Sequence, residues 1–97
     1  MRIIWTAPAR RDLRSQVFYV AERNPDAARR LQAAIRQAVE GLADHPNRGR
    51  PGRYEGTREL VVAGSPDVVV YRVREVSVRI LRVLHGAQDW PPPGGIK

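Results

Sequence analysis

The second half of the sequence holds four basic residues whose side chains could act on phosphate groups: Arg58, Arg72, Arg82 and His85. Arginine keeps its charge when it is partly desolvated, and its guanidinium binds phosphate or carboxylate with paired hydrogen bonds. Histidine can give or take a proton near neutral pH. The four side chains could therefore bind an anionic partner, or supply the cations and the acid or base that phosphodiester cleavage requires.

The positions of these residues depend on three runs rich in aliphatic and β-branched side chains. The runs predict strands over residues 57–62, 68–74 and 76–85, because such side chains favour extended backbone. Residues 64–67, Gly-Ser-Pro-Asp, form a turn sequence, and Glu75 marks a tight reversal. We therefore expect a three-stranded antiparallel meander that presents positive charge to an anionic partner.

Arg82 stands out within the last of these runs. Side chains alternate between the two faces of a strand, so Arg82 shares its face with aliphatic residues. The other members of that row are Val76, Val78, Ile80 and Leu84. An unpaired buried charge is costly, so the guanidinium needs a carboxylate, carbonyl oxygens or a ligand. We expect Glu59 as its structural partner, with ligand contact as the alternative, and Arg58 and Arg72 raise the same question.

The first half of the sequence predicts a short strand over residues 2–6 and two helices over 8–23 and 25–44. Apolar residues recur at spacings of three and four in both helical segments, which places them on one face of each helix. The first face is Ala9, Leu13, Val17 and Val20, and the second is Ala28, Leu31, Ile35, Ala38 and Leu42. The side chains of Arg10, Arg11, Arg14 and Gln16 are expected to face water. The two helices should form an antiparallel hairpin.

Turn-forming residues mark the boundaries of these segments. Asn24 is an expected N-cap and Pro25 fits the first turn of the second helix. Residues 45–52 are rich in Pro, Gly and Asn and are expected to be a loop. Arg48 and Arg50 in this loop, and Arg53 just after it, could bind phosphate or carboxylate. We expect instead that the loop is a solvated connector. Residues 91–97 are expected to be an extended or frayed tail.

Length and composition restrict the class of protein. A chain of 97 residues suits a single domain, and its formal net charge of +7 favours acidic partners. The absence of cysteine rules out disulfides and thiolate metal sites, and two histidines without ligand spacing predict no metal and no cofactor. The apolar start is too short for a signal peptide or a membrane span, so we expect a cytoplasmic protein that does not enter membranes.

The order and spacing of several short motifs resemble the RelE/ParE superfamily of type II toxins, and within it the ParE branch. The resemblance covers nearly the whole chain. In the first half it rests on Ile4-Trp5, Ala9-x-x-Asp12-Leu13, Asn24-Pro25-x-Ala27-Ala28 and Gly49-Arg50-Pro51-Gly52. In the second half it rests on Gly56-Thr57-Arg58-Glu59-Leu60, Tyr71-Arg72-Val73 and Ile80-Leu81-Arg82-Val83-Leu84-His85. It implies an α+β fold with a strand, a helical hairpin and an antiparallel meander packed against the hairpin.

The resemblance also implies a function, with two possible targets. A ParE-like toxin stabilises the cleaved-DNA state of DNA gyrase, needs no catalytic residue, and is neutralised by an antitoxin encoded beside it. A RelE-like toxin enters the ribosome and cuts messenger RNA as an endoribonuclease. The only lysine is Lys97 and no tyrosine follows Tyr71, which departs from the usual RelE-type pattern and favours the gyrase inhibitor.

Candidate site residues follow from both readings. If the protein is a nuclease, Arg58, Arg72 and Arg82 would be the cations and His85 the acid or base. For a gyrase inhibitor we expect the same four residues and Trp90 to contact the target, although Trp90 could equally cover the edge of the core and His85 could be an ordinary surface residue. A third possibility is a basic domain that binds nucleic acid without chemistry, which the aromatic content of 6% disfavours.

The expected antitoxin is an acidic protein of the ParD type. We expect it to be partly disordered until it folds along the toxin and buries apolar surface. Its carboxylates would pair with Arg10, Arg14 or Arg36 on the helices.

Overall fold

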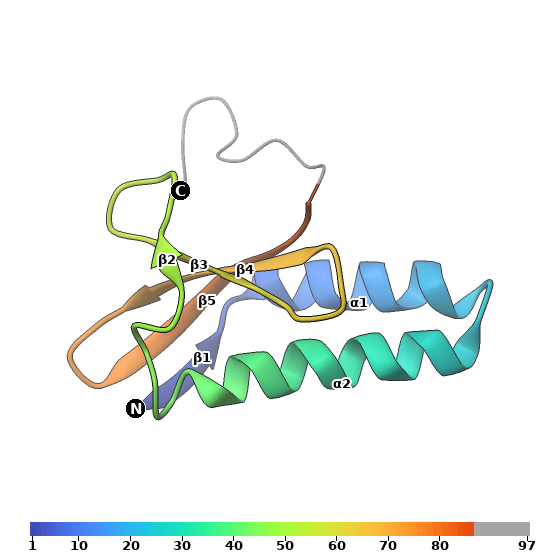
Figure 1. The fold of residues 1–97 in the computed structure, drawn as a ribbon, viewed down its shortest axis with the longest axis horizontal. Coiled ribbons are helices and arrows are strands. Elements are labelled where there is room, and N and C mark those ends of the chain that lie inside the picture. Colours follow the sequence, from blue (N-terminus) through green and yellow to red (C-terminus); the bar gives the residue numbers. More distant parts are fainter. Residues whose placement is uncertain (87–97) are drawn as a thin grey trace.

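Five strands form one sheet, and two helices pack together as a hairpin against one of its faces (Figure 1). The structure is a computed structural model, and it describes residues 1–86. The elements are β1 (Arg2–Trp5), α1 (Ala7–Ala21), α2 (Pro25–Gly41), β2 (Arg50–Pro51), β3 (Arg58–Val61), β4 (Asp67–Val73) and β5 (Ser77–His85). The predicted α+β fold is confirmed. The predicted tail over residues 91–97 lies outside the described residues.

The helices begin where local sequence signals place them. The Thr6 side chain caps α1 by accepting a hydrogen bond from the Ala9 N–H at 3.3 Å, and the Asn24 side chain caps α2 by accepting from the Ala27 N–H at 3.1 Å. Both helices carry a proline in their first turn. Each ends two or three residues earlier than predicted, because Glu22 and Leu42 already act as C-caps.

The strand order is β1-β5-β4-β3-β2. The meander β3-β4-β5 is antiparallel as predicted, and β1 adds to its far side by pairing in parallel with β5. The predicted loop 45–52 is wrong at one point, because Arg50 and Pro51 pair with β3 as the edge strand β2. Proline, which has no backbone N–H, is tolerated there because the outer side of an edge strand forms no hydrogen bonds with another strand.

The core lies between the helices and the sheet and includes Ile35, Leu42 and Tyr71, each with no exposed surface. A β-bulge between Val70 and Tyr71 leaves Leu81 without a partner. The predicted alternation along β5 is therefore wrong beyond this point. Val78, Ile80 and Val83 belong to the core under the helices, whereas Leu84 packs with Val70 and Leu81 in a second cluster.

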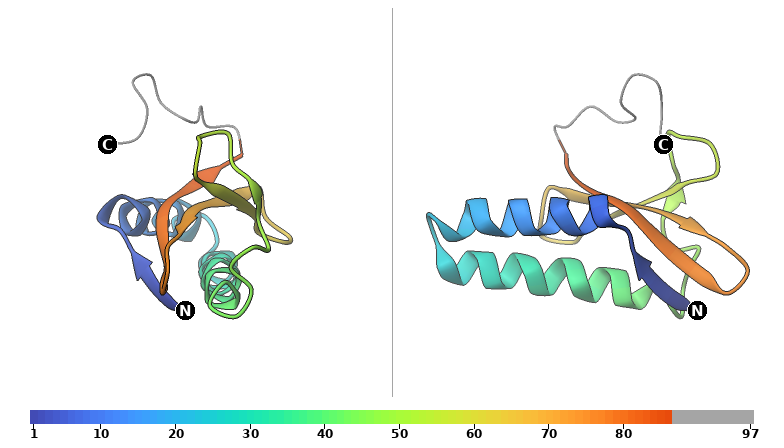
Figure 2. Two further views of the ribbon diagram at one scale, coloured as in Figure 1. Left: turned by 90° about the vertical axis from the view of Figure 1, so that its left-hand side faces the viewer. Right: turned by 180° about the vertical axis from the view of Figure 1, so that it is seen from behind.

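The two helices lie side by side in each view, with the N-terminus close to the end of α2 (Figure 2). The terminal ammonium of Met1 donates a hydrogen bond to the Ala43 carbonyl at 3.0 Å, which ties β1 to the end of the hairpin. Within residues 1–86, neither helix has the length and apolarity that a membrane crossing requires.

Candidate functional site

Arg58 holds the loop before β2 against the sheet. Its guanidinium donates to the Gly49 carbonyl at 2.6 Å and more weakly to the Asn47 carbonyl at 3.4 Å. The Tyr71 hydroxyl supports the same loop by accepting from the Gly49 N–H at 2.9 Å and donating to the Pro46 carbonyl at 2.7 Å. Arg58 is thus engaged by backbone oxygens of the chain itself.

Arg82 forms a bidentate ion pair with Asp12 of α1. Its Nε and Nη2 atoms donate to the two carboxylate oxygens at 2.7 and 3.0 Å, and one of these oxygens also accepts from the Val83 N–H at 2.9 Å. The hydrogen bonds that Arg82 donates to Asp12 raise the pKa of Arg82, against the lowering effect of burial. The predicted partner Glu59 is wrong, because β4 separates β3 from β5 and the Glu59 carboxylate is bound by Arg50 and Arg53.

Arg72 lies on the face of the sheet away from the helices, because its neighbour Tyr71 points into the core. It stands opposite Arg79 of β5. Its Nε atom is buried and has no hydrogen-bond partner within residues 1–86, and the backbone at Gly56 passes beside the guanidinium. Within residues 1–86, the Arg72 Nε atom is thus left without an acceptor, whereas the Arg58 and Arg82 guanidinium groups both donate hydrogen bonds.

His85 lies at the other end of β4 and β5, opposite Asp67. Arg72 and Asp67 are both in β4, and their places in the register put Arg72 and His85 about 16 Å apart along the strands. By register, Arg58, Arg72 and Arg82 lie at neighbouring levels of β3, β4 and β5, but Arg58 binds the Gly49 carbonyl and Arg82 binds Asp12, and His85 lies near the other end of β5. The four side chains therefore do not gather around one point. Trp90, the fifth target-binding candidate, lies outside the described residues.

The three predicted antitoxin-binding residues do come together. Arg10 and Arg14 are one turn apart on α1, Arg36 comes from α2, and all three are exposed. They line a depression of about 310 Å³ together with Trp5 and Leu13. We call these five residues the arginine cleft. It offers three cations above an apolar floor.

A basic and aromatic surface continues the arginine cleft along α1. Phe18 lies one turn beyond Arg14 and is 68% exposed, and both residues line a second depression with Arg11, Asp12 and Ser15. An exposed phenylalanine between arginines suits a partner that is both acidic and apolar.

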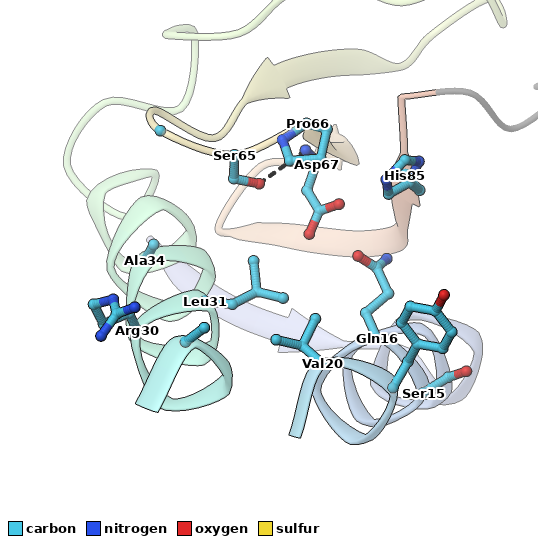
Figure 3. A pocket seen from close by; sticks show the side chains of 13 residues that line it. Ser15, Gln16, Val20, Arg30, Leu31, Ala34, Ser65, Pro66, Asp67 and His85 are labelled. Carbon is cyan, nitrogen blue, oxygen red and sulfur yellow. Dashed lines mark hydrogen bonds between the residues drawn. The ribbon is translucent and has the colours of Figure 1, made fainter. Parts of the chain in front are cut away.

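A larger pocket, of about 740 Å³, opens between the two helices and the turn that joins β3 to β4 (Figure 3). We call it the interhelical pocket. Its lining is Ser15, Gln16, Tyr19, Val20, Ala27, Arg30, Leu31, Ala34, Gly64, Ser65, Pro66, Asp67 and His85. Sequence reasoning missed this pocket, because its walls come from segments that are far apart in the chain.

Asp67 is the unusual residue of the interhelical pocket. Only 1% of its surface is exposed, and its Oδ2 atom is buried without a hydrogen-bond partner among the described residues. Burial raises the pKa of the Asp67 carboxyl, and the positive charge of His85 opposes that shift. A single acidic residue ahead of a run of valines was the only sequence signal for this site.

No metal centre is evident in the part of the chain that the structure covers. Within residues 1–86, no group of three His, Asp or Glu side chains lies close enough together to hold a metal ion.

Comparison with known proteins identifies the family. Residues 3–90 match the model of the ParE toxin of the type II toxin-antitoxin system parDE. The chain belongs to the ParE toxin family. The RelE/ParE resemblance read from the motifs is thereby confirmed.

Two relatives that align over nearly the whole chain are named as toxins. The Y4kP protein of Sinorhizobium fredii, named only as a candidate toxin, is 47% identical over 93% of each chain, and Toxin RelE2 of Caulobacter vibrioides is 36% identical over 90% of this chain and 97% of its own.

Two solved structures share the fold of this ParE family member. A chain of the chromosomal ParDE system from P. aeruginosa matches with a TM-score of 0.79 and 26% identity, covering 88% of this chain and 95% of that one. A chain of the toxin-antitoxin complex RelBE2 from Mycobacterium tuberculosis matches with a TM-score of 0.64 and 31% identity, covering 87% and 95%.

Proposed function

We propose that this protein is the toxin of a type II toxin-antitoxin pair that inhibits DNA gyrase by stabilising the cleaved-DNA state of the enzyme. Membership of the ParE family and the close structural match to a ParDE chain support gyrase as the target. A protein that binds one state of an enzyme more tightly than the others shifts the population toward that state, and no bond-making residue is needed. Gyrase works in the bacterial cytoplasm, where we expect this protein to act.

The separation of Arg72 from His85 carries the argument for docking rather than catalysis. Cleavage of RNA needs a proton acceptor, a proton donor and cations around one phosphate, all within hydrogen-bonding reach. Arg72 and His85 lie about 16 Å apart along the strands, and Arg58 and Arg82 are engaged by backbone carbonyls and by Asp12. This dispersed arrangement suits a contact surface for a large partner.

A ribosome-dependent endoribonuclease is the second candidate function. It is favoured by the names of two relatives, Toxin RelE2 and Toxin RelE1 of Caulobacter vibrioides, which are 36% and 32% identical to this chain. On this reading Arg72 and His85 would contact different nucleotides of the message. The two functions are distinguished by the molecule that is broken, the plasmid or the transcript.

We also propose an acidic antitoxin as the partner that neutralises this protein. The two solved structures with the same fold belong to a ParDE toxin-antitoxin system and to the RelBE2 toxin-antitoxin complex, which supports such a partner. The three arginines of the arginine cleft are exposed and could pair with carboxylates, while Trp5 and Leu13 accept apolar side chains.

The test of the proposed function adds the purified protein to two reactions, one with gyrase and supercoiled plasmid and one with translating ribosomes and a reporter message. We expect linear plasmid with gyrase covalently attached, and an intact message. Preincubation with the antitoxin encoded beside the toxin should abolish the effect. Cut message with undisturbed gyrase would replace the first candidate function by the second, and binding to bare nucleic acid alone, weakening steeply with salt, would indicate the third class.

A further inference from the structure

The interhelical pocket contains a buried carboxylate that the described part of the chain does not satisfy. Asp67 is 1% exposed and its Oδ2 atom has no hydrogen-bond partner there. Its backbone, by contrast, is well held, since the Asp67 N–H donates to the Ser65 hydroxyl at 2.9 Å and its carbonyl accepts from the Val62 N–H at 2.9 Å. A rigid backbone therefore presents a carboxylate that lacks a donor, and this is costly unless a partner supplies one.

The carboxylate points into the pocket. Figure 3 shows it directed away from the β3–β4 turn and toward the helices, on the side where Leu31, Val20 and Gln16 lie. The Gln16 Nε2 atom, the nearby amide donor, already donates a hydrogen bond to the Val83 carbonyl at 2.8 Å. The pocket therefore combines an acidic group with apolar wall residues, among them Val20, Leu31 and Ala34.

We propose that the interhelical pocket receives one arginine side chain of the antitoxin, whose guanidinium pairs with Asp67. The inference rests on the proposed function and deepens it. Arginine fits both parts of the pocket, because its methylene stem packs on apolar walls and its head stays charged when desolvated. A guanidinium can also bind both oxygens of one carboxylate.

The other charged groups of the pocket do not prevent this pairing. Arg30 and His85 also line it and would repel a cation, but both are exposed, so solvent and salt screen their charges. Asp67 is buried, where attraction between opposite charges is much stronger. Arg23, which stacks 4.0 Å above the Tyr19 ring, already covers one face of that aromatic wall.

The proposed pairing gives the antitoxin a fixed orientation. Its acidic residues would lie on the arginine cleft, whereas one basic residue, of opposite sign to the rest, would enter the interhelical pocket. If the antitoxin bound in the reverse direction or in a shifted register, its carboxylates would lie next to Asp67 and its basic residue next to the arginines of the arginine cleft. Such repulsion against wrong alignments is a usual source of specificity between related partners.

The test measures the affinity between the toxin and the antitoxin encoded beside it in double-mutant cycles. Each cycle compares four pairs, formed from wild-type or variant toxin and wild-type or variant antitoxin. Asp67→Asn should weaken binding about thirtyfold or more, the usual loss when one partner of a buried ion pair is neutralised. Replacing each antitoxin arginine by glutamine in turn should identify one whose loss is severe with the wild-type toxin and small with the Asp67→Asn toxin. That coupling in a double-mutant cycle is the signature of a direct pair.

The control is Asp44→Asn, the same chemical change at an exposed residue outside the pocket, which should leave affinity unchanged. The melting temperature of the free Asp67→Asn toxin should equal or exceed that of wild type, because a buried unpaired charge has been removed. Unchanged affinity of Asp67→Asn, or the absence of any coupled arginine, overturns the inference while the toxin-antitoxin function stands. Failure of the antitoxin to bind the wild-type toxin at all overturns the proposed function itself.

Discussion

At the residue scale, the hydroxyl of Tyr71 ties the sheet to the loop before β2. It is fully buried, and it bridges the Gly49 N–H and the Pro46 carbonyl. Gly49 packs so closely that a Cβ atom there would lie 2.7 Å from the Tyr71 oxygen, so the position admits only glycine without movement. These contacts also place the carbonyl that binds Arg58.

Tyr71→Phe is therefore expected to lower the free energy of unfolding by about 1–3 kcal/mol, the cost of leaving buried donors and acceptors unsatisfied. Urea denaturation measures this change. Tyr19→Phe is the matched control, because Tyr19 is 59% exposed and should tolerate the loss of its hydroxyl. Equal stability of the two variants would contradict the role given to the Tyr71 hydroxyl.

A second residue-scale prediction concerns Glu59, which is 1% exposed. Burial alone would raise the pKa of its carboxyl, but hydrogen bonds from the Arg53 N–H at 2.8 Å and from the Arg50 side chain at 3.2 Å bring the pKa below its ordinary value of 4.5. A lowered pKa means that the ionised form stabilises the fold above pH 4.5, and that this contribution is lost as the pH falls below it.

The stability difference between wild type and Glu59→Gln should therefore be largest near neutral pH and shrink as the pH falls below about 4.5. Urea denaturation across a pH series measures it. Asp67→Asn should behave in the opposite sense, because burial raises the pKa of Asp67, so neutralising it by mutation helps most at neutral pH. A difference for Glu59→Gln that does not change with pH would refute this account.

At the element scale, side chains of α1 and of its N-cap residue bind backbone groups on the edge of β5 where its pairing with β1 ends. The Thr6 hydroxyl donates to the Ile80 carbonyl at 2.7 Å, the Gln16 amide donates to the Val83 carbonyl, and Asp12 accepts from the Val83 N–H. Polar side chains of a helix thus satisfy backbone groups that a sixth strand would otherwise pair. The prediction that Gln16 faces water is wrong for this reason.

Asp12→Asn should destabilise the protein by about 2 kcal/mol, because hydrogen bonds to charged groups contribute more than neutral ones. Thermal or chemical unfolding measures the loss. In a cycle with Arg82→Ala the two losses should add to clearly more than that of the double variant, since both changes break the same ion pair. Arg11→Ala, an exposed neighbour on α1, is the control, and strict additivity of Asp12→Asn and Arg82→Ala would argue against the pair.

The elements show how far local sequence signals reach. The starts of both helices, at Ala7 and Pro25, and the three strands of the meander were predictable to within a residue, because caps, periodicity and turns are encoded within a few residues. Helical spacing places Arg10 and Arg14 one turn apart, but the arginine cleft also needs Arg36 and Trp5, which the packing of α2 and β1 brings beside them. The Asp12–Arg82 pair and the parallel pairing of β1 join segments up to 75 residues apart, from Arg2 to Ser77. The interhelical pocket likewise brings together residues from Ser15 to His85.

At the scale of the whole molecule, exposed cations gather on the helical hairpin while the sheet arginines are spread out. The arginine cleft should therefore dominate binding of the acidic antitoxin. Arg10→Glu combined with Arg14→Glu is expected to weaken the complex at least tenfold and to reduce its dependence on salt, because carboxylates of the antitoxin would meet like charges. Calorimetry at two salt concentrations measures this. The control is Arg29→Glu combined with Arg74→Glu, which makes the same change in net charge at two exposed residues outside the arginine cleft. Equal effects of the two double variants would show that only net charge matters.

We propose that the protein disables gyrase by docking and breaks no bonds itself. The direct test is to titrate it into a fixed amount of gyrase on supercoiled plasmid and to count the covalent gyrase–DNA complexes. We expect these complexes to rise in proportion to the toxin, to reach a plateau near one toxin per binding site, and to disappear when excess antitoxin is added. Gyrase that turns over normally at saturating toxin, or nucleic acid cut by trace amounts of toxin without gyrase, would contradict it.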